Sequence, residues 1–214
     1  EIHSELKPGD VLLVRAEQKL TSAVLPSFWA HAAIYFGGRE DLLRLGLRTH
    51  RHVSSHWDSL PQERGRFGHV IEAINPRTTI SPLEKSLHAD HVALLRPNFP
   101  PEEIAGALAE AFGHLGKPYD YEFDFSVSSR IVCTELIYRS YHHHGAVEFP
   151  LVKRLGRFTL SGDDIALLAG HPMSSGDVHH SAPFQLVQLV LKGPDGRACV
   201  IPQTEALETL RQIH

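Results

Sequence analysis

The apolar residues of this 214-residue chain come in short runs that end at turns. Residues 11–14, 30–36, 69–74 and 90–96 each have the length and character of a buried strand, and glycine or proline closes the last three of these runs. None approaches the roughly 20 residues that a membrane-spanning helix needs. The pattern predicts an α+β fold, in which a small, mostly antiparallel sheet packs against helices.

Two longer helices are expected between the strands and the end of the chain. Residues 100–115 begin with proline and acidic side chains and repeat apolar residues at helical spacing. A second helix is predicted over 131–144, with Ser128 or Ser129 as its N-cap. Shorter elements are expected at 161–168, 184–191 and 204–213. We expect one domain over residues 1–214, with a long insertion at 39–68, of the kind that forms lids, and a C-terminal extension at 146–214.

Charge and composition narrow the class of partner. The formal net charge of -4 argues against nucleic acid, because phosphate binding needs a basic face. The first residues are polar, and Met173 is the only methionine, so the sequence as given begins without an initiator residue. We expect a soluble protein, either cytoplasmic or in the cell envelope after removal of a leader. The oligomeric state stays open.

Cys133 is the strongest candidate nucleophile. It lies in the first turn of the predicted helix 131–144, where the helix dipole stabilises a thiolate and free N–H groups can hold an oxyanion. With two cysteines in the chain, a disulfide framework is excluded. The alternative is a buried structural cysteine, which is the more common role of a lone cysteine on an apolar helix.

Two further residues could complete a catalytic group. His31 begins the strand 30–36, and the alternative is a histidine with a purely structural role. Glu72 lies in an apolar strand, where a carboxylate is costly to bury unless it is paired. Such a carboxylate could orient a catalytic imidazole. The alternative is a glutamate that faces solvent from an alternating strand.

Five segments together resemble one known family. They are residues 7–13, 29–38, 70–73, 116–121 and 132–137, with the sequences KPGDVLL, WAHAAIYFGG, VIEA, GKPYDY and VCTELI. The chain is identified as a member of the circularly permuted NlpC-type papain-like cysteine hydrolases, in the YiiX-like branch. The order of the segments, with the histidine and acidic strands before the cysteine helix, is the permuted one.

The resemblance implies both a fold and a set of roles. It implies a permuted papain-like fold with Cys133 as nucleophile, His31 as base and Glu72 as the residue that orients the base. Tyr119 matches an active-site tyrosine ahead of the nucleophile, to which we assign substrate binding. Thr134 departs from the family, in which serine is common at this position. No cofactor or metal is implied.

The expected activity is hydrolysis of an amide bond through an acyl-enzyme, with a peptide-like, cell-wall-like substrate as the first choice. Two alternatives stay open. One is a lipid acyltransferase or thioesterase that acts on an acyl small molecule, since relatives of the lecithin:retinol acyltransferase type share the scaffold. The other is a non-catalytic binding module.

The remaining histidines and the second cysteine predict no site of their own. His142, His143 and His144 are expected to complement the negative end of a helix rather than to bind metal, because neighbouring helical residues point in different directions. The sequence has no paired Cys-x-x-Cys and no His-Glu-x-x-His motif. Cys199 is expected to be an inert core residue.

Overall fold

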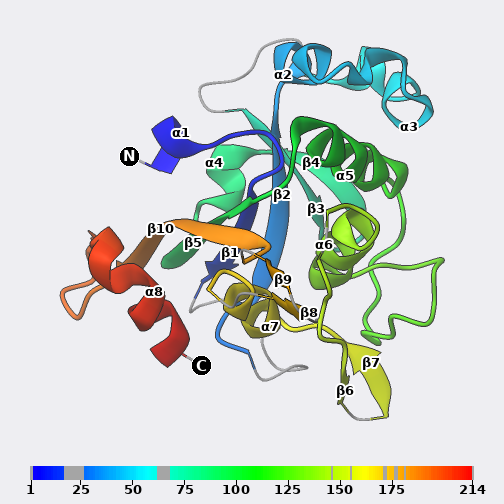
Figure 1. Ribbon diagram of the computed structural model, residues 1–214. Helices are drawn as coiled ribbons and strands as arrows, with labels where there is room; N and C mark the ends of the chain where they lie inside the picture. The colour runs from blue at the N-terminus through cyan, green and yellow to red at the C-terminus, as the bar shows by residue number, and fades with distance from the viewer. Residues whose placement is uncertain are drawn as a thin grey trace.

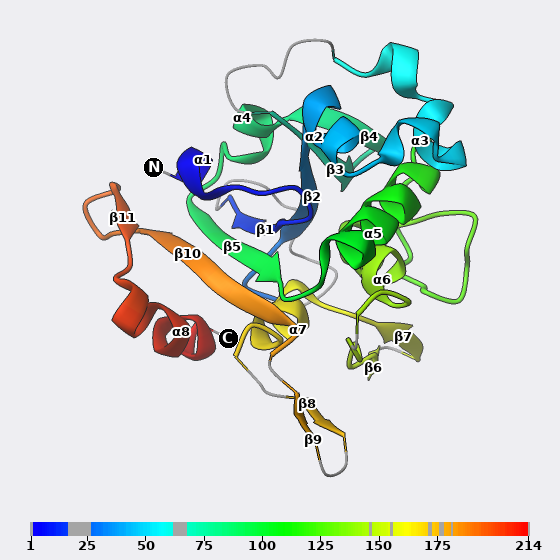
Figure 2. The same ribbon diagram turned by 45° about the horizontal axis from the view of Figure 1, so that its top comes forward.

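The computed structural model describes residues 2–16, 27–61, 68–145, 147–154, 156–170, 173–175, 178–180 and 182–213 (Figures 1 and 2). Its strands are β1 (Val11–Arg15), β2 (His31–Gly37), β3 (His69–Ala73), β4 (Thr78–Pro82), β5 (His91–Pro97), β6 (Val152–Arg154), β7 (Arg157–Thr159), β8 (Met173–Ser175), β9 (Val178–His180), β10 (Phe184–Lys192) and β11 (Ala198–Val200). Its α-helices are α1 (Ile2–Glu5), α2 (Arg39–Arg44), α3 (Arg51–Ser54), α4 (Leu83–Ser86), α5 (Pro101–Gly113), α6 (Cys133–Tyr141), α7 (Gly162–Leu167) and α8 (Gln203–Gln212). Two 3₁₀ turns are η2 (Leu47–Thr49) and η3 (Trp57–Ser59).

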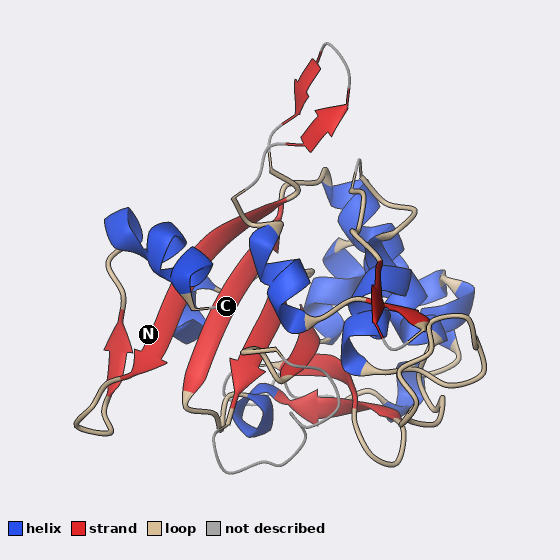
Figure 3. Ribbon diagram, turned by 90° about the horizontal axis from the view of Figure 1, so that it is seen from below, coloured by secondary structure: helices blue, strands red, loops and turns tan. Residues whose placement is uncertain are grey.

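One sheet organises the molecule. Seven strands pair in the order β11-β10-β5-β1-β2-β3-β4, and every pair is antiparallel. The predicted α+β class and antiparallel pairing are therefore confirmed, although the sheet is larger than the small one expected. Two separate hairpins, β6–β7 and β8–β9, complete the strands, and β8–β9 stands away from the sheet (Figures 2 and 3).

The alternation of side chains along the strands gives the sheet two buried faces. On one face Ala32 and Ile34 of β2 pack in the main core with Cys133 and Leu136 of α6. On the other face alternate strand residues pack in a smaller core, to which α1 and α4 contribute. The sheet is therefore covered on both sides, which explains why its strands read as almost continuous apolar runs.

The register of β2 and β3 brings His31 and Glu72 to the same face of the sheet. Ala33 pairs with Glu72, and His31 lies two residues before Ala33 along β2. Side chains two residues apart on a strand share a face, so His31 and Glu72 are diagonal neighbours. Because His31 is also the first residue of β2, its ring lies at the end of the sheet.

The helix that carries the nucleophile candidate begins later than predicted. The structure starts α6 at Cys133, with Val132 rather than Ser128 or Ser129 as its N-cap. Residues ahead of it are held by Tyr119, which forms a parallel bridge with Ile131. Ile131 N–H donates to the Pro118 carbonyl. This pairing uses the backbone groups that a longer helix would need, and it leaves Cys133 as the first helical residue.

The described part of the insertion at 39–68 is helical, whereas an irregular segment was expected. Its described part, residues 39–61, forms α2, η2, α3 and η3. This part follows the end of β2 that is opposite to His31. His52 of α3 contacts the Ala109 carbonyl of α5 at 3.2 Å. This part is therefore helical rather than irregular, and its role as a lid stays a prediction; residues 62–67 lie outside the described residues. Short helices of four to six residues escape sequence analysis because they are too short to show a period.

The C-terminal region completes the sheet. β10 pairs with β5, and Phe184, Leu186 and Leu189 of β10 are buried in the main core. β11 follows as the edge strand, and here Cys199 is exposed. The expectation of a buried Cys199 is wrong, because an apolar triplet on a short edge strand has only one neighbouring strand to cover it. Within the described ranges, no helix has the length and apolar character needed to cross a bilayer.

Candidate active site

His31 lies between the two other predicted site residues. Its Nε2 lies 2.8 Å from Oε2 of Glu72. The imidazole also hydrogen-bonds the side chain of Cys133. Because Nε2 faces Glu72, Nδ1 is the ring nitrogen that remains for this contact. About a fifth of the His31 side chain is exposed, at 22%, whereas the Glu72 side chain is 4% exposed. The three residues predicted from β2, β3 and α6 are thus brought together at the end of the sheet.

Glu72 is held by more than its histidine partner. Ser86 of α4 donates its hydroxyl to the same carboxylate oxygen at 3.2 Å, and Ser81 of β4 also hydrogen-bonds the carboxylate. Burial disfavours the charged form, yet the hydrogen bond and charge of His31 and the two serines outweigh it, and the pKa of Glu72 falls to about 2. Glu72 is therefore ionised at neutral pH.

Cys133 is placed where a thiolate is stabilised. Its side chain is buried, with the residue 5% exposed. Burial by itself raises the pKa of the Cys133 thiol, but the hydrogen bond and charge of His31 and the backbone N–H groups of Ala32 and Thr134 lower it overall. Its position as the first residue of α6 adds the positive end of the helix dipole.

The charge on His31 follows from the same contacts. Burial lowers the pKa of the imidazole, but the hydrogen bond and charge of Cys133, and then those of Glu72, raise it to about 10. A raised histidine pKa beside a lowered cysteine pKa favours a thiolate–imidazolium pair at neutral pH. The arrangement can therefore supply both a nucleophile and a proton donor.

Tyr119 lies beside this group. It forms ring contacts with Tyr121 and Phe123, with centroids 5.2 and 6.4 Å apart. Burial, and then the negative charge of Cys133, raise the pKa of Tyr119 well above its usual range. The hydroxyl therefore stays protonated and can donate a hydrogen bond. No residue in the described part of the chain accepts from it.

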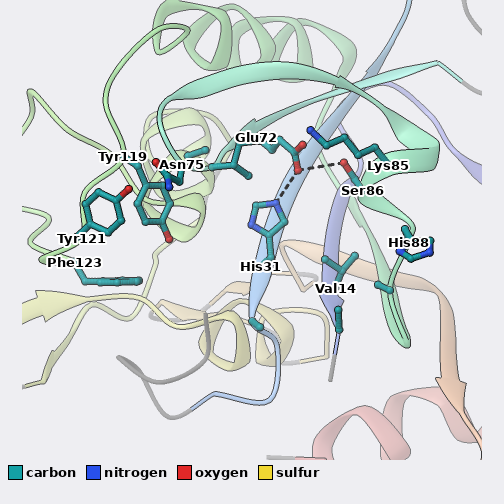
Figure 4. Close-up of a pocket in the computed structure, with 15 residues that line it drawn as sticks. Val14, His31, Glu72, Asn75, Lys85, Ser86, His88, Tyr119, Tyr121 and Phe123 are labelled. Atoms are coloured by element: carbon teal, nitrogen blue, oxygen red, sulfur yellow. Dashed lines mark hydrogen bonds and ion pairs between the residues drawn. The ribbon is translucent and has the colours of Figure 1, made fainter. Parts of the chain in front are cut away.

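A cavity of about 460 Å³ opens beside His31 (Figure 4). Its volume is in the range of small-molecule sites. Cys133 lies outside the wall, next to His31. In Figure 4, Tyr119, Tyr121 and Phe123 lie to one side of His31, and Lys85, Ser86 and His88 lie to the other. The lining residues are Val14, Ala16, Ala30, His31, Glu72, Ala73, Ile74, Asn75, Lys85, Ser86, His88, Ala89, Tyr119, Tyr121 and Phe123.

A second buried charged pair lies behind Cys133 on α6. Glu135 is fully buried and accepts a hydrogen bond from Nε of Arg139 at 2.6 Å. The carboxylate also accepts from the backbone N–H of Val132, the N-cap of α6. Arg139 in turn donates to the Phe125 carbonyl at 3.0 Å. This pair ties the first turn of α6 to the loop that follows Tyr119.

The other groups that sequence analysis singled out lie apart from this site. Among the residues that the structure describes, no three His, Cys, Asp or Glu side chains are placed to hold a metal ion. His144 contacts Glu103 of α5 at 3.0 Å, and Cys199 lies on β11 at the far edge of the sheet.

Sequence analysis missed the residues that surround Glu72. Ser86, Lys85 and Asn75 come from the segment between β3 and β5, for which no element was predicted. A signal was present at Ser81-Pro82, because serine and proline together often precede a helix. The N–H group of Ala32 could not be found from residue type, because every non-proline residue has one.

Comparison with solved structures identifies a similar fold. The crystal structure of "metalloprotein yiiX" from Escherichia coli O157:H7 has a TM-score of 0.51 against this chain and 16% sequence identity. The match covers 92% of this chain and 96% of that one. At this identity the likeness speaks for the fold alone.

The sequence itself matches a family of enzymes. No curated protein matches the sequence. The family described as "Permuted papain-like amidase enzyme, YaeF/YiiX, C92 family" matches residues 5–204, which includes most of the region 146–214 that was predicted to be a C-terminal extension. The match covers all five segments that predicted a permuted cysteine hydrolase, three of which contain strands of the antiparallel sheet. The chain therefore belongs to the YaeF/YiiX family of permuted papain-like amidases, and it is a papain-like cysteine hydrolase.

Proposed function

We propose that this protein cleaves an amide bond of a peptide-like substrate, with Cys133 as the nucleophile, His31 as the acid and base, and Glu72 as the residue that orients His31. One observation carries the proposal. The His31 ring hydrogen-bonds Cys133 and, through Nε2, lies 2.8 Å from Glu72. A nucleophile, a base and an orienting carboxylate linked in this order form the minimum needed for acyl transfer.

The first half of the reaction forms an acyl-enzyme. The Cys133 thiolate attacks the carbonyl carbon of the amide, so that a sulfur–carbon bond forms and the carbonyl oxygen becomes negative. The His31 imidazolium then gives its proton to the amide nitrogen as the carbon–nitrogen bond breaks, and the amine leaves. Glu72 stabilises the imidazolium until that proton is transferred.

The second half returns the enzyme to its starting state. A water molecule loses a proton to neutral His31 and attacks the thioester carbon. The carbon–sulfur bond breaks, the carboxylic acid leaves, and Cys133 and His31 regain their ion pair. In both halves the negative oxygen lies near the N-terminus of α6, and the Tyr119 hydroxyl, protonated and without an acceptor among the described residues, can donate to it.

The test is to trap the acyl-enzyme. The protein is incubated with a library of N-acyl peptides and the reaction is quenched in acid. The mass of the peptide that contains Cys133 is then measured by mass spectrometry. We expect an acyl mass on Cys133, none on Cys199, and none on Cys133 in a His31→Ala variant. If no substrate class gives either an adduct or hydrolysis, the result would contradict catalysis and would favour a binding module.

A second candidate function has one observation in its favour. The cavity beside His31 is walled mainly by apolar and aromatic side chains, including Val14, Ile74 and Phe123. Such walls suit the acyl chain of a lipid thioester or ester, so a thioesterase or acyltransferase would use the same thiol. Parallel libraries of acyl esters and acyl amides separate the two functions, because only an amidase turns over the amides.

A further inference from the structure

We propose that Lys85 binds a free carboxylate on the amine portion of the substrate, so that the preferred substrates are amides between an apolar or aromatic acyl group and an amino acid. This inference rests on the proposed function and narrows its substrate class. It is carried by the charges of the cavity wall and by the arrangement of its polar and aromatic ends around His31.

Among the described residues, the cavity wall carries one formal charge without an ion-pair partner. The Glu72 carboxylate is matched by His31 at 2.8 Å. Lys85 is exposed, and among the described residues that line the cavity it is the one lysine or arginine. Within the described ranges it makes no ion pair. A cationic group on a mostly apolar wall attracts an anionic part of a ligand.

The two ends of the cavity differ in character. Figure 4 shows the rings of Tyr119, Tyr121 and Phe123 on one side of His31 and the Lys85 side chain on the other, with Glu72 between His31 and Lys85. A ligand that spans the cavity therefore meets aromatic surface at one end and an ammonium group at the other. Its scissile bond would lie in the middle, beside His31.

The reaction decides which part of the substrate lies at each end. The leaving amine takes its proton from His31, so it must lie on the His31 side of the scissile carbon. Lys85 lies further along that side, beyond Glu72. The carboxylate that Lys85 binds therefore belongs to the leaving amine, and the acyl group lies toward Tyr119.

The backbone of Lys85 has a fixed position relative to the catalytic group. It is the third residue of α4, and the next residue, Ser86, donates its hydroxyl to Glu72 at 3.2 Å. Leu83 at the start of α4 donates its N–H to the Gly68 carbonyl, just before β3. The same short helix thus positions the orienting carboxylate and carries the ammonium group.

Binding tests the proposal without the need for turnover. In a Cys133→Ala background, the affinities of N-benzoylglycine and its neutral carboxamide are measured by calorimetry at low salt. We expect the carboxylate to bind about fivefold more tightly, as an exposed charge pair allows, and this preference to shrink as salt is added. Lys85→Met should abolish the preference, and Lys85→Arg should keep most of it. Lys153→Met, an equal change of charge at an exposed position outside the cavity wall, should leave the preference intact.

The outcomes separate this inference from the proposed function. An equal preference in the Lys85→Met and Lys153→Met variants, or no binding of either compound, would overturn the role of Lys85. Hydrolysis of N-benzoylglycine to benzoate and glycine by the unmodified protein is measured in parallel. A Lys85-dependent binding preference without turnover would support the role of Lys85 and contradict the proposed amidase activity. Turnover without a Lys85-dependent preference would support the amidase activity and contradict the role of Lys85.

Discussion

Cys133 and Cys199 carry the same thiol in two different surroundings. Cys133 is buried against His31, which lowers its pKa, and Cys199 is exposed on β11. In native-state alkylation with iodoacetamide, we expect labelling of Cys133 to follow a pKa well below the roughly 8.5 of a free thiol, and the exposed Cys199 serves as the internal reference. Peptide mass spectrometry over a pH series measures both sites in one sample.

The shape of each pH profile, rather than its height, is the useful quantity, because burial slows access to Cys133. His31→Ala should raise the apparent pKa at Cys133 and leave Cys199 unchanged. Two profiles with the same midpoint would show that Cys133 is not activated.

The charged pair also predicts the pH dependence of turnover. In the proposed mechanism the active thiolate–imidazolium form requires His31 to keep its proton, so activity should be lost as pH rises through about 10, to which the pKa of His31 is raised. Since Glu72 is one cause of that raised pKa, Glu72→Gln should move the alkaline limb to lower pH and reduce kcat about 100-fold. Measurement of kcat/KM against pH for both proteins checks this.

A Glu72→Gln variant with unchanged kcat and an unmoved alkaline limb would mean that Glu72 is only a strand residue. Circular dichroism at neutral pH serves as the control, because the amide can still accept hydrogen bonds from His31, Ser81 and Ser86. A folded variant with low activity is the expected result.

At the residue scale, the sequence predicted the central group but not its surroundings. Cys133, His31 and Glu72 could be proposed because each is unusual in type for its place and because the resemblance linked them. Lys85 and Ser86 could not, since their relation to Glu72 depends on how α4 packs on β3. The prediction that Cys199 is buried was wrong because an apolar triplet does not reveal whether its strand lies at the edge of a sheet.

At the scale of elements, the turn after β2 depends on one glycine. Gly37 has a φ of +79°, and a Cβ added there would lie 2.1 Å from Oδ2 of Asp41. We expect Gly37→Ala to destabilise the protein by about 2–3 kcal/mol, through backbone strain and the displaced carboxylate. Urea unfolding measures the change.

Gly46→Ala is the matched control. Gly46 has a similar φ of +71°, but a Cβ added there meets nothing within 4 Å. Its loss of stability should therefore contain only the backbone part, about 1 kcal/mol. Equal losses at the two positions would show that the Asp41 contact contributes nothing.

The first turn of α6 contains a carboxylate with an opposite pH response to that of Glu72. Burial, the largest effect, raises the pKa of Glu135 from 4.5 to about 7 despite the charge of Arg139. The folded state therefore binds more protons than the unfolded state between these values, and its stability falls as pH rises through this range. Glu135→Gln should remove about 2 kcal/mol of that fall.

Urea unfolding near the two ends of this range measures the effect. Glu205→Gln on α8, an exposed position, is the control and should keep the pH dependence of the unmodified protein. If Glu135→Gln behaves like this control, Glu135 titrates normally and burial has no effect on it.

Seven of the elements that sequence analysis predicted share one property: their apolar residues form a clear strand-like run or repeat at helical spacing. β1, β2, β3, β5, β10, α5 and α6 all have it, and their ends were predicted to within a few residues. β4 and α4 were missed because Thr78–Pro82 and Leu83–Ser86 are short and partly polar, so tertiary packing rather than local pattern decides their structure.

At the scale of the whole molecule, the C-terminal region forms part of the main core. Phe184, Leu186 and Leu189 of β10 are buried in it, and each such side chain contributes about 2 kcal/mol by burial. Since a domain of this size is stable by only about 5–15 kcal/mol, removal of residues 184–214 should abolish cooperative folding. Circular dichroism during thermal unfolding measures this, and the full chain should unfold in one transition.

A truncated protein that keeps a sharp unfolding transition would contradict the single domain that the sequence predicts. It would also mean that β5 is stable as an edge strand. The exposed hydrophobic edge would then be expected to drive association, which gel filtration would detect.

The order of the segments along the chain has a consequence for biosynthesis. β1, β2, β3 and β4 are consecutive in the chain and pair with their neighbours in the sheet, so His31 and Glu72 can be brought together while the ribosome is still adding later residues. Cys133 is synthesised after both. In the proposed mechanism, the thiol therefore leaves the ribosome as a weakly nucleophilic cysteine, and it becomes reactive only when α6 docks on a sheet that already holds its partners.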